Sequence, residues 1–298
     1  MTKMRKMTPL ERYHARMQRV LDHIACNLDD DLSLDVLSGI AAFSKHHFHR
    51  QFAALFGVSV HRYVQLARMK RASYRLAFRV GDAITEIALD AGYEAPESFA
   101  RAFRQRFGQV PSDFRKSPDW EPWLAAFGPL TQARSTQMKT SYTNADVTII
   151  DTPPIPIALM EHRGDPARIG DSIQRFIAWR KAAGLSPRTS ATFNLFHTDP
   201  RTTPADETHI DLCAATDRPI AATELGVEAG LIPGGRCARL RVTGSSDDLE
   251  PSASWLYRDW LPASGEEPRD FPFYCQRVSF FPDVPEHEAI TDLFLLLR

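Results

Sequence analysis

The sequence has few cysteines and lacks any long hydrophobic run. Its 298 residues include four cysteines, Cys26, Cys213, Cys237 and Cys275, and no C-x-x-C pair. Such usage is typical of free thiols in a reducing compartment. No apolar run reaches the roughly 18 residues that a transmembrane helix needs, and no apolar segment follows the basic N-terminus as in a signal peptide. We therefore expect a soluble, cytoplasmic protein.

Sequence motifs of common enzyme classes are also missing. The chain contains no G-x-S-x-G, H-E-x-x-H, Walker A or G-x-G-x-x-G pattern. In the C-terminal half, the one adjacent acid–base pair to weigh is Glu161-His162. Neighbouring side chains on a strand point to opposite faces, which argues against a catalytic dyad. We therefore predict no enzymatic activity, no catalytic residue and no cofactor.

Acidic residues are missing from one long stretch. Residues 37–81 contain no Asp or Glu but eight Lys and Arg. Residues 1–118 hold 19 Lys and Arg against 12 Asp and Glu, whereas the remainder holds 17 against 25. A chain of this length is expected to form two domains. The charge split predicts that the basic domain binds a polyanion and that the acidic domain has another task.

The basic half contains one motif twice. The pattern F-x-R-x-F-x-x-x-F-G runs from Phe48 to Gly57 and again, 51 positions later, from Phe99 to Gly108. Three Phe at a spacing of four share one helix face. The Arg lies about 200° around the helix, and the Gly ends it. Each copy therefore predicts a helix with a buried aromatic stripe and an outward cation.

Periodicity and capping residues predict seven helices in this half. They are expected over 10–27, 33–42, 45–56, 60–79, 82–91, 96–107 and 111–116. The fourth is roughly 20 residues and thus about 30 Å long, and it separates two similar pairs of short helices. A short helix, a tight turn and a second helix with an exposed cation form a helix-turn-helix unit. Two such units held apart by a long helix are predicted.

Residues 9–118 resemble the AraC/XylS-type DNA-binding domain, in which a long helix joins two helix-turn-helix units. The resemblance is carried by both Phe motifs, by residues 34–44, 63–76 and 84–93, and by G-x-x-P-x-x-F-R from Gly108. It implies that the third and sixth helices enter successive major grooves. The expected base-reading residues are His46, His49, Arg50, Glu97, Ser98 and Arg101. The expected phosphate contacts are Arg62, Arg68, Arg104 and Arg106.

The chemistry of these side chains suits base recognition. Arg50 and Arg101 can each pair with guanine O6 and N7, and Glu97 can accept from cytosine N4. Glu97 can equally be a favourable charge in the first helical turn. The histidines around His46 have no Cys or carboxylate at ligand spacing, so no metal site is predicted. Because the residues around the two Arg differ, we expect the two units to read different bases.

Composition and periodicity change after residue 118. Residues 119–145 are Trp- and Pro-containing and then polar, which predicts a linker. From 146 to 298 the pattern alternates between short strands and helices. Residues 160–164 and 240–244 look like an internal repeat. The fold class predicted is therefore an all-α N-terminal domain plus an α+β C-terminal domain of two β-α-β-β units with a groove between the halves.

Residues 146–298 resemble the GyrI-like effector-binding domain, through fragments that begin at Glu161, His209, Ile232, Trp260 and Pro285. The resemblance implies a sensor of small molecules, often lipophilic or cationic. The family commonly places a Glu after a Pro in the penultimate strand. Here 272–276 reads P-F-Y-C-Q, so a neutral or differently polar ligand is expected. The predicted ligand contacts are Phe193, Phe196, Trp255, Tyr257, Trp260, Phe273, Tyr274 and Cys275, although each aromatic residue can equally be core.

Together these patterns predict a cytoplasmic, nucleoid-associated transcription regulator. Its expected partners are double-stranded promoter DNA, a small-molecule effector and RNA polymerase, with no membrane; it can be a monomer or a dimer. Two other functions fit the same residues. One is a protein that sequesters a ligand or binds DNA without sequence preference. The other is a small-molecule hydrolase of the GyrI-like type.

Overall fold

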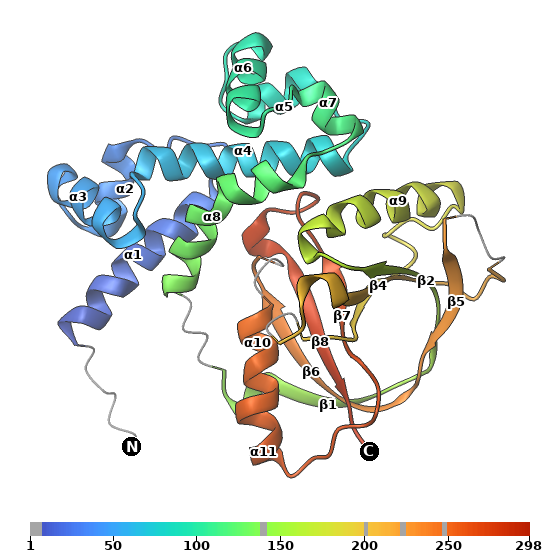
Figure 1. Ribbon diagram of the computed structural model, residues 1–298. Helices are drawn as coiled ribbons and strands as arrows, with labels where there is room; N and C mark the ends of the chain where they lie inside the picture. The colour runs from blue at the N-terminus through green and yellow to red at the C-terminus, as the bar shows by residue number, and fades with distance from the viewer. Residues whose placement is uncertain (1–7, 138–141, 200–201, 221–224, 246–248) are drawn as a thin grey trace. The chain divides into compact units, whose positions relative to one another are not determined.

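The computed structural model describes residues 8–137, 142–199, 202–220, 225–245 and 249–298. The chain divides into two compact units, Met1–Lys139 and Thr140–Arg298 (Figure 1). The first unit is helical and the second is built on a β-sheet with helices, which confirms the predicted fold class. All four cysteines are free thiols. Within the described ranges, no helix combines the length and apolar character needed to cross a bilayer.

The described part of the first unit contains the seven predicted helices, with bounds within two residues of those expected, and one further helix. They are α1 (Pro9–Cys26), α2 (Leu34–Ala41), α3 (Lys45–Phe56), α4 (Val60–Phe78), α5 (Ile84–Asp90), α6 (Pro96–Phe107), α7 (Pro111–Lys116) and α8 (Trp120–Gln137). The hydroxyls of Ser33, Ser44 and Ser59 accept from backbone N–H groups in the first turns of α2, α3 and α4. Gly57 and Gly108 end α3 and α6 in the left-handed conformation.

The duplicated Phe stripes form the core of the two helix-turn-helix units. All three Phe of each copy are buried. Adjacent rings pack edge to face, with centroids 4.6 Å apart for Phe52 and Phe56 and 4.5 Å apart for Phe103 and Phe107. Such pairs add stability beyond the area that they bury. The repeat is therefore required for packing in both units.

The stretch predicted as a linker, 119–145, differs from that expectation because most of it is helix α8. Its apolar residues recur every three or four positions, and Trp120, Trp123, Phe127 and Leu130 are buried in the helical core. The Trp123 indole also donates to the hydroxyl of Ser73 on α4 at 2.7 Å. Burial of this stripe makes α8 part of the first unit. Residues 138–141 of the predicted linker lie outside the described part of the chain.

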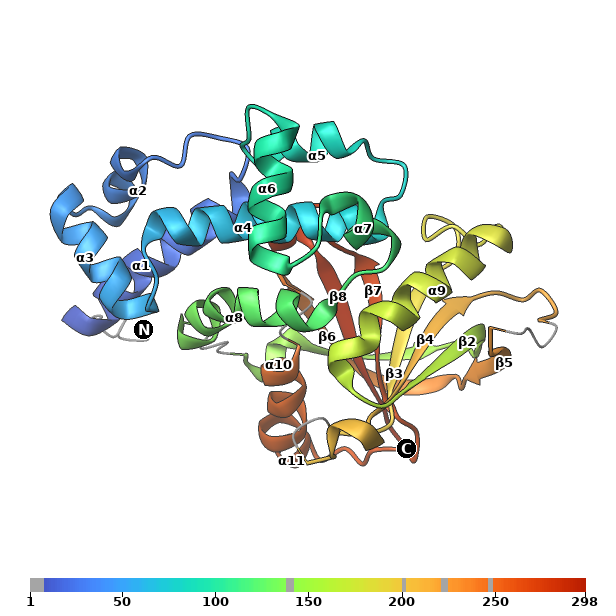
Figure 2. The ribbon, with the colours of Figure 1, turned by 45° about the horizontal axis from the view of Figure 1, so that its top comes forward.

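The second unit is one antiparallel eight-stranded sheet with helices on one face. Its strands are β1 (Val147–Thr152), β2 (Ile155–Arg163), β3 (Thr192–Phe196), β4 (His209–Ala215), β5 (Val227–Ile232), β6 (Gly235–Thr243), β7 (Phe273–Ser279) and β8 (Ile290–Leu296). They lie in the order β1-β6-β8-β7-β3-β4-β2-β5. The helices are α9 (Ile169–Ala182), α10 (Glu250–Trp255), the π-helix η4 (Leu256–Trp260) and α11 (Leu261–Ser264). Figure 2 shows α9 beside β2 and β4.

The internal repeat predicted for this unit is visible in the strands. β2 and β6 are each nine residues long and share one burial pattern. Each is followed by a glycine of positive φ, Gly164 or Gly244, whose N–H donates to the carbonyl of Thr208 or Ala289. β5, which the sequence analysis did not predict, pairs with β2, while β1 pairs with β6. Each half is therefore β-β-α-β-β rather than the predicted β-α-β-β. The first strand of each half, β1 or β5, pairs with the second strand of the other half, β6 or β2.

Candidate nucleic-acid interface and ligand-binding unit

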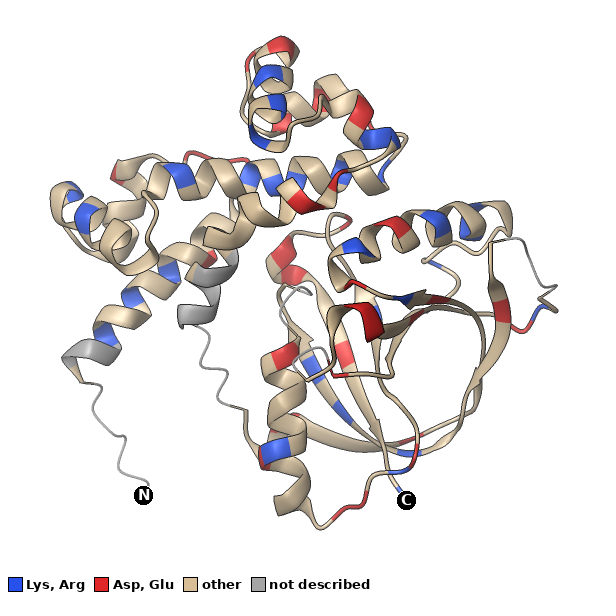
Figure 3. Cartoon of the chain, in the orientation of Figure 1, with Lys and Arg blue, Asp and Glu red and all other residues tan. Residues whose placement is uncertain are grey.

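The predicted base-reading residues are exposed on the two expected helices. His46, His49 and Arg50 lie on α3, and Glu97, Ser98 and Arg101 lie on α6. They face outward because the Phe stripe of each helix faces the core. In the described part of the chain, the side chains of Arg50 and Arg101 form no hydrogen bond or ion pair, so both guanidinium groups are available to a ligand. Figure 3 shows Lys and Arg along α3, α4 and α6.

Several cations of the acid-free stretch are neutralised by acids that flank it. Arg71 on α4 forms a bidentate ion pair with Asp29 and donates to the Asp90 carbonyl at 2.7 Å. Arg75 pairs with the carboxylates of Asp82, at 2.7 Å, and Asp90. The hydrogen bond from Arg71 lowers the pKa of Asp29. Arg71 thus connects the loop after α1 to α5, and Arg75 connects α4 to α5 and the residue Asp82 before it. Both cations hold the helical unit together and are not free charges.

Arg68, a predicted phosphate contact, is also engaged inside the helical unit. Its Nε donates to the carbonyl of Leu28 at 2.8 Å and its Nη2 to that of Asp30 at 3.0 Å. Its Nη1 lies next to Gly92, in the turn between α5 and α6. Two of its three nitrogen atoms are thus occupied by the loop that precedes α2. The structure therefore places Arg68 where it fixes the two helix-turn-helix units to α4.

The other predicted phosphate contacts remain accessible. Arg62 and Arg104 are exposed, and Arg106 is half-buried. Burial lowers the pKa of Arg106, and the like charge of Arg62 lowers it further. Arg62 lies in the first turn of α4 and Arg106 in the last turn of α6, and both cations lie near Tyr93. A phosphate between them would relieve that repulsion.

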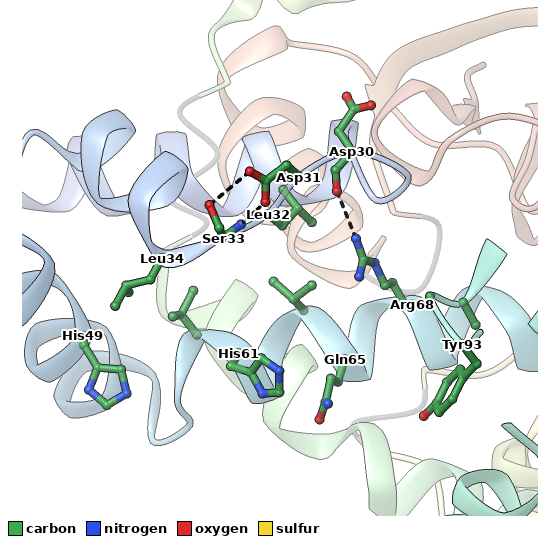
Figure 4. A pocket seen from close by; sticks show the side chains of 14 residues that line it. Asp30, Asp31, Leu32, Ser33, Leu34, His49, His61, Gln65, Arg68 and Tyr93 are labelled. Atoms are coloured by element: carbon green, nitrogen blue, oxygen red, sulfur yellow. Dashed lines mark hydrogen bonds between the residues drawn. The ribbon is translucent and has the colours of Figure 1, made fainter. Parts of the chain in front are cut away.

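A cavity of about 440 Å³ lies between the two helix-turn-helix units (Figure 4). His49 of α3, His61 and Gln65 of α4, and Tyr93 line it, together with the loop 30–34. Figure 4 shows the His61 and Gln65 side chains extending from the same side of α4. His49 belongs both to this cavity and to the predicted reading surface. The cavity therefore extends that surface along α4 towards the second helix-turn-helix unit.

In the sheet unit, the predicted ligand contacts fall on two faces. Phe193 and Tyr274 lie on the face without helices, in a core with Ile157 and Phe294. On the opposite face, a second group joins the sheet to α10 and η4. It consists of Phe196, Phe273 and Cys275 of the sheet with Trp255 of α10 and Trp260 of η4. Tyr257 is exposed beside that group, with its ring 5.8 Å from the Phe273 ring. The structure thus brings these residues together as two clusters rather than one.

A polar cluster that the sequence analysis did not recognise lies on β2, β4 and the residue after β3. It consists of Glu161, His197, His209 and Asp211. His162, the neighbour of Glu161, points to the other face and contacts the hydroxyl of Ser172 at 2.9 Å, which agrees with the expected separation of that pair. The period-two spacing of His209 and Asp211 was the available signal. That spacing places His209 and Asp211 on one face of a strand, but it does not indicate that Glu161 and His197 lie beside them.

Comparisons with known proteins agree with the two units. Residues 145–298 match the model of the GyrI-like small molecule binding domain, and residues 37–117 match that of a helix-turn-helix domain. The probable transcriptional regulator YgiV of Escherichia coli K12 is 39% identical over 153 residues, 51% of this chain and 96% of YgiV. The right origin-binding protein of the same strain is 32% identical over 134 residues, 44% of this chain and 43% of that protein. The solved EcmrR–DNA complex overlaps 85% of this chain and 82% of its own, at 13% identity and a TM-score of 0.45.

Proposed function

Because the chain belongs to the GyrI-like small-molecule-binding family and carries an AraC-type helix-turn-helix domain, we propose that it is a transcription regulator whose binding to promoter DNA responds to a small molecule. The helical unit binds the DNA through α3 and α6. The sheet unit binds the effector. RNA polymerase is the proposed protein partner at the promoter, and no catalytic role is assigned.

The observation that carries the DNA-binding role is the pair of exposed arginines at equivalent positions. Arg50 and Arg101 each lie opposite a buried Phe stripe, on helices that share one hydrophobic core with α4. α4 has 19 residues, or about 28 Å, whereas successive major grooves on one side of a duplex are about 34 Å apart. The two helix-turn-helix units can therefore reach adjacent grooves if the DNA bends modestly. The surroundings of Arg50 and Arg101 differ, so the site is asymmetric.

The proposed ligand contacts remain the two aromatic clusters of the sheet unit. The cluster under α10 and η4 has an exposed member, Tyr257, beside Phe273, which offers a ligand an accessible aromatic edge. No acid follows Pro272 in β7. We therefore propose a lipophilic, neutral or differently polar effector.

Binding of the purified full chain to promoter fragments tests the DNA-reading role. Arg50→Ala and Arg101→Ala should each weaken specific binding by about 1–3 kcal/mol and relax base preference in one half of the site. Arg188→Ala, which removes an exposed cation from the sheet unit, is the matched control for net charge and should bind normally. Unchanged affinity in both reader variants, or equal loss in the control, contradicts the assignment.

A second experiment separates a regulator from a protein that only sequesters its ligand. A thermal-shift screen of lipophilic neutral and cationic compounds should identify one that raises the melting temperature of the full chain. That compound should then change the affinity for the promoter fragment but not for unrelated DNA. A compound that binds without any effect on DNA affinity supports the sequestering function instead.

A further inference from the structure

The internal repeat places two buried aspartates at equivalent positions of the sheet. Asp211 lies on β4 opposite Glu161 of β2, and Asp292 lies on β8 opposite Arg241 of β6. Both aspartate side chains are nearly inaccessible, at 5% and 4% exposure. A buried carboxylate needs a compensating charge or hydrogen bonds to remain ionised. The two halves of the repeat meet this need differently.

In the second half, the cross-strand arginine neutralises the aspartate. Arg241 Nε and Nη2 each donate to one oxygen of Asp292 at 2.7 Å, which is a bidentate ion pair. In the first half, the equivalent position holds Glu161, a second carboxylate. Like charges directly opposite each other on neighbouring strands destabilise the pair. Asp211 therefore has no arginine directly opposite it, and nearby Arg163 is hydrogen-bonded to Glu161.

Two histidines occupy the space around Asp211. His197 Nε2 is 2.7 Å from Asp211 Oδ2, and His209 Nε2 is 3.0 Å from Oδ1 and 3.5 Å from Glu161 Oε1. The two rings stack with centroids 3.9 Å apart. The backbone N–H of His197 donates to the backbone carbonyl of His209 at 3.1 Å, and the backbone N–H of His209 donates to the Thr198 hydroxyl. These bonds hold the two residues side by side, and the Nε2 atoms of both imidazoles lie against the same carboxylate.

We propose that His197, His209 and Asp211 bind a divalent transition-metal ion of the zinc class, with Glu161 or water in the fourth position. Bonds of about 2.0–2.2 Å in a tetrahedron separate the ligand atoms by about 3.3 Å. The separations of 2.7 and 3.0 Å between the histidine nitrogens and Asp211 would widen by about 0.6 and 0.3 Å, and the 3.5 Å separation between His209 and Glu161 would shorten by about 0.2 Å. The ligand atoms of the two histidines and Asp211 all lie within 4.8 Å of one another. Imidazole and carboxylate groups are the donor set that zinc accepts.

The metal ion would supply the charge that Arg241 supplies in the other half. Its binding uses the Nε2 lone pairs of both histidines, so each metal-bound ring would carry its proton on Nδ1 instead of donating it from Nε2 to Asp211. Arg163, which donates to Glu161 at 2.9 Å, holds that carboxylate beside the site. The side chain of His197 is 29% exposed, which gives an ion access from solvent. The bound ion would link β2, β4 and the end of β3.

Isothermal titration of the metal-free full chain with Zn²⁺ tests the proposal. We expect one ion per chain, and at least tenfold weaker binding in His197→Ala, His209→Ala and Asp211→Asn. His287→Ala is the matched control, since His287 lies 3.4 Å from Glu288 in the same unit and is outside the His–Asp cluster. Absence of stoichiometric binding, or unchanged binding in the His197→Ala and Asp211→Asn variants, overturns the site.

The wild-type chain provides a test that does not depend on a variant folding. Co²⁺ bound by imidazole and carboxylate groups should give visible d–d bands of a four-coordinate ion without a thiolate charge-transfer band. The nearby Cys213 is buried in the hydrophobic core of the sheet unit, so a thiolate ligand is not expected. A thiolate band, or a spectrum of the six-coordinate aqueous ion, overturns the assignment. This measurement requires no DNA and is independent of the regulatory role.

Discussion

Arg68 fills the space that a side chain on Gly92 would need. A Cβ atom added to Gly92 would lie 3.0 Å from Arg68 Nη1. Gly92 also has a φ of +84°, in the left-handed region that favours glycine. The turn of the second helix-turn-helix unit is thus fitted against α4, while the same arginine holds the loop before α2 through its other nitrogens. The Arg68 side chain therefore connects both helix-turn-helix units to the long helix α4.

The turns of the two units predict opposite effects of exchanging glycine and alanine. Ala42 is the counterpart of Gly92, and its φ of +52° strains an alanine. Gly92→Ala should destabilise the helical unit by more than about 1 kcal/mol, because both φ and Arg68 oppose it. Ala42→Gly should instead stabilise it by about 0.5–1 kcal/mol. Denaturant unfolding measures both, and equal signs would contradict the strain argument.

The contacts of Arg68 predict that it contributes to stability more than to salt-dependent DNA binding. Arg104→Ala removes an exposed cation and should lower the slope of log affinity against log salt by about 0.9, the value for one phosphate contact. Arg68→Ala should leave the slope unchanged but reduce the free energy of unfolding, since the carbonyl of buried Leu28 and the carbonyl of Asp30 lose their donor. Salt titrations of both variants decide this. A reduced slope with unchanged stability in Arg68→Ala would identify it as a phosphate contact.

The ion pair of Arg71 with Asp29 predicts a pH-dependent part of stability. The hydrogen bond from Arg71 lowers the pKa of Asp29 in the folded chain below its value in the unfolded chain. Stability from this pair is therefore present above the unfolded pKa of about 3.9 and is lost as the pH falls through the lowered folded pKa. Asp29→Asn should cost about 0.5–1 kcal/mol at pH 7, since Asp29 is largely exposed, and nothing in strong acid.

A control for this prediction lies on α1. Asp22 accepts from the Gln18 amide at 2.7 Å, and Asp22→Asn keeps a carbonyl oxygen for that bond. Its unfolding free energy should stay within about 0.5 kcal/mol of the wild-type value and show the wild-type pH profile. If Asp29→Asn behaves in the same way over pH 3 to 7, the pair contributes no measurable stability.

Local sequence signals determined the helical unit well. The serine caps, the Phe spacing and the helix-ending glycines act within one or two turns, so the bounds of α2, α3, α4 and α6 follow from short windows of sequence. α8 was not predicted, because its Pro and polar residues are typical of a linker. Its Trp stripe has a partner only once α4 and α6 are in place. The edge strand β5 was missed because it carries no strong apolar alternation.

The sequence by itself determined two helix-turn-helix units with outward arginines, a joined GyrI-like unit and the repeat within it. These follow from local periodicity, capping and motif order. Only the tertiary structure decided that Arg68, Arg71 and Arg75 bind acids and carbonyls inside the helical unit. It also brought His197, His209 and Asp211 together with Glu161. Strand register and the pairing of distant charges arise from contacts between residues far apart in the chain, which no short stretch of sequence specifies.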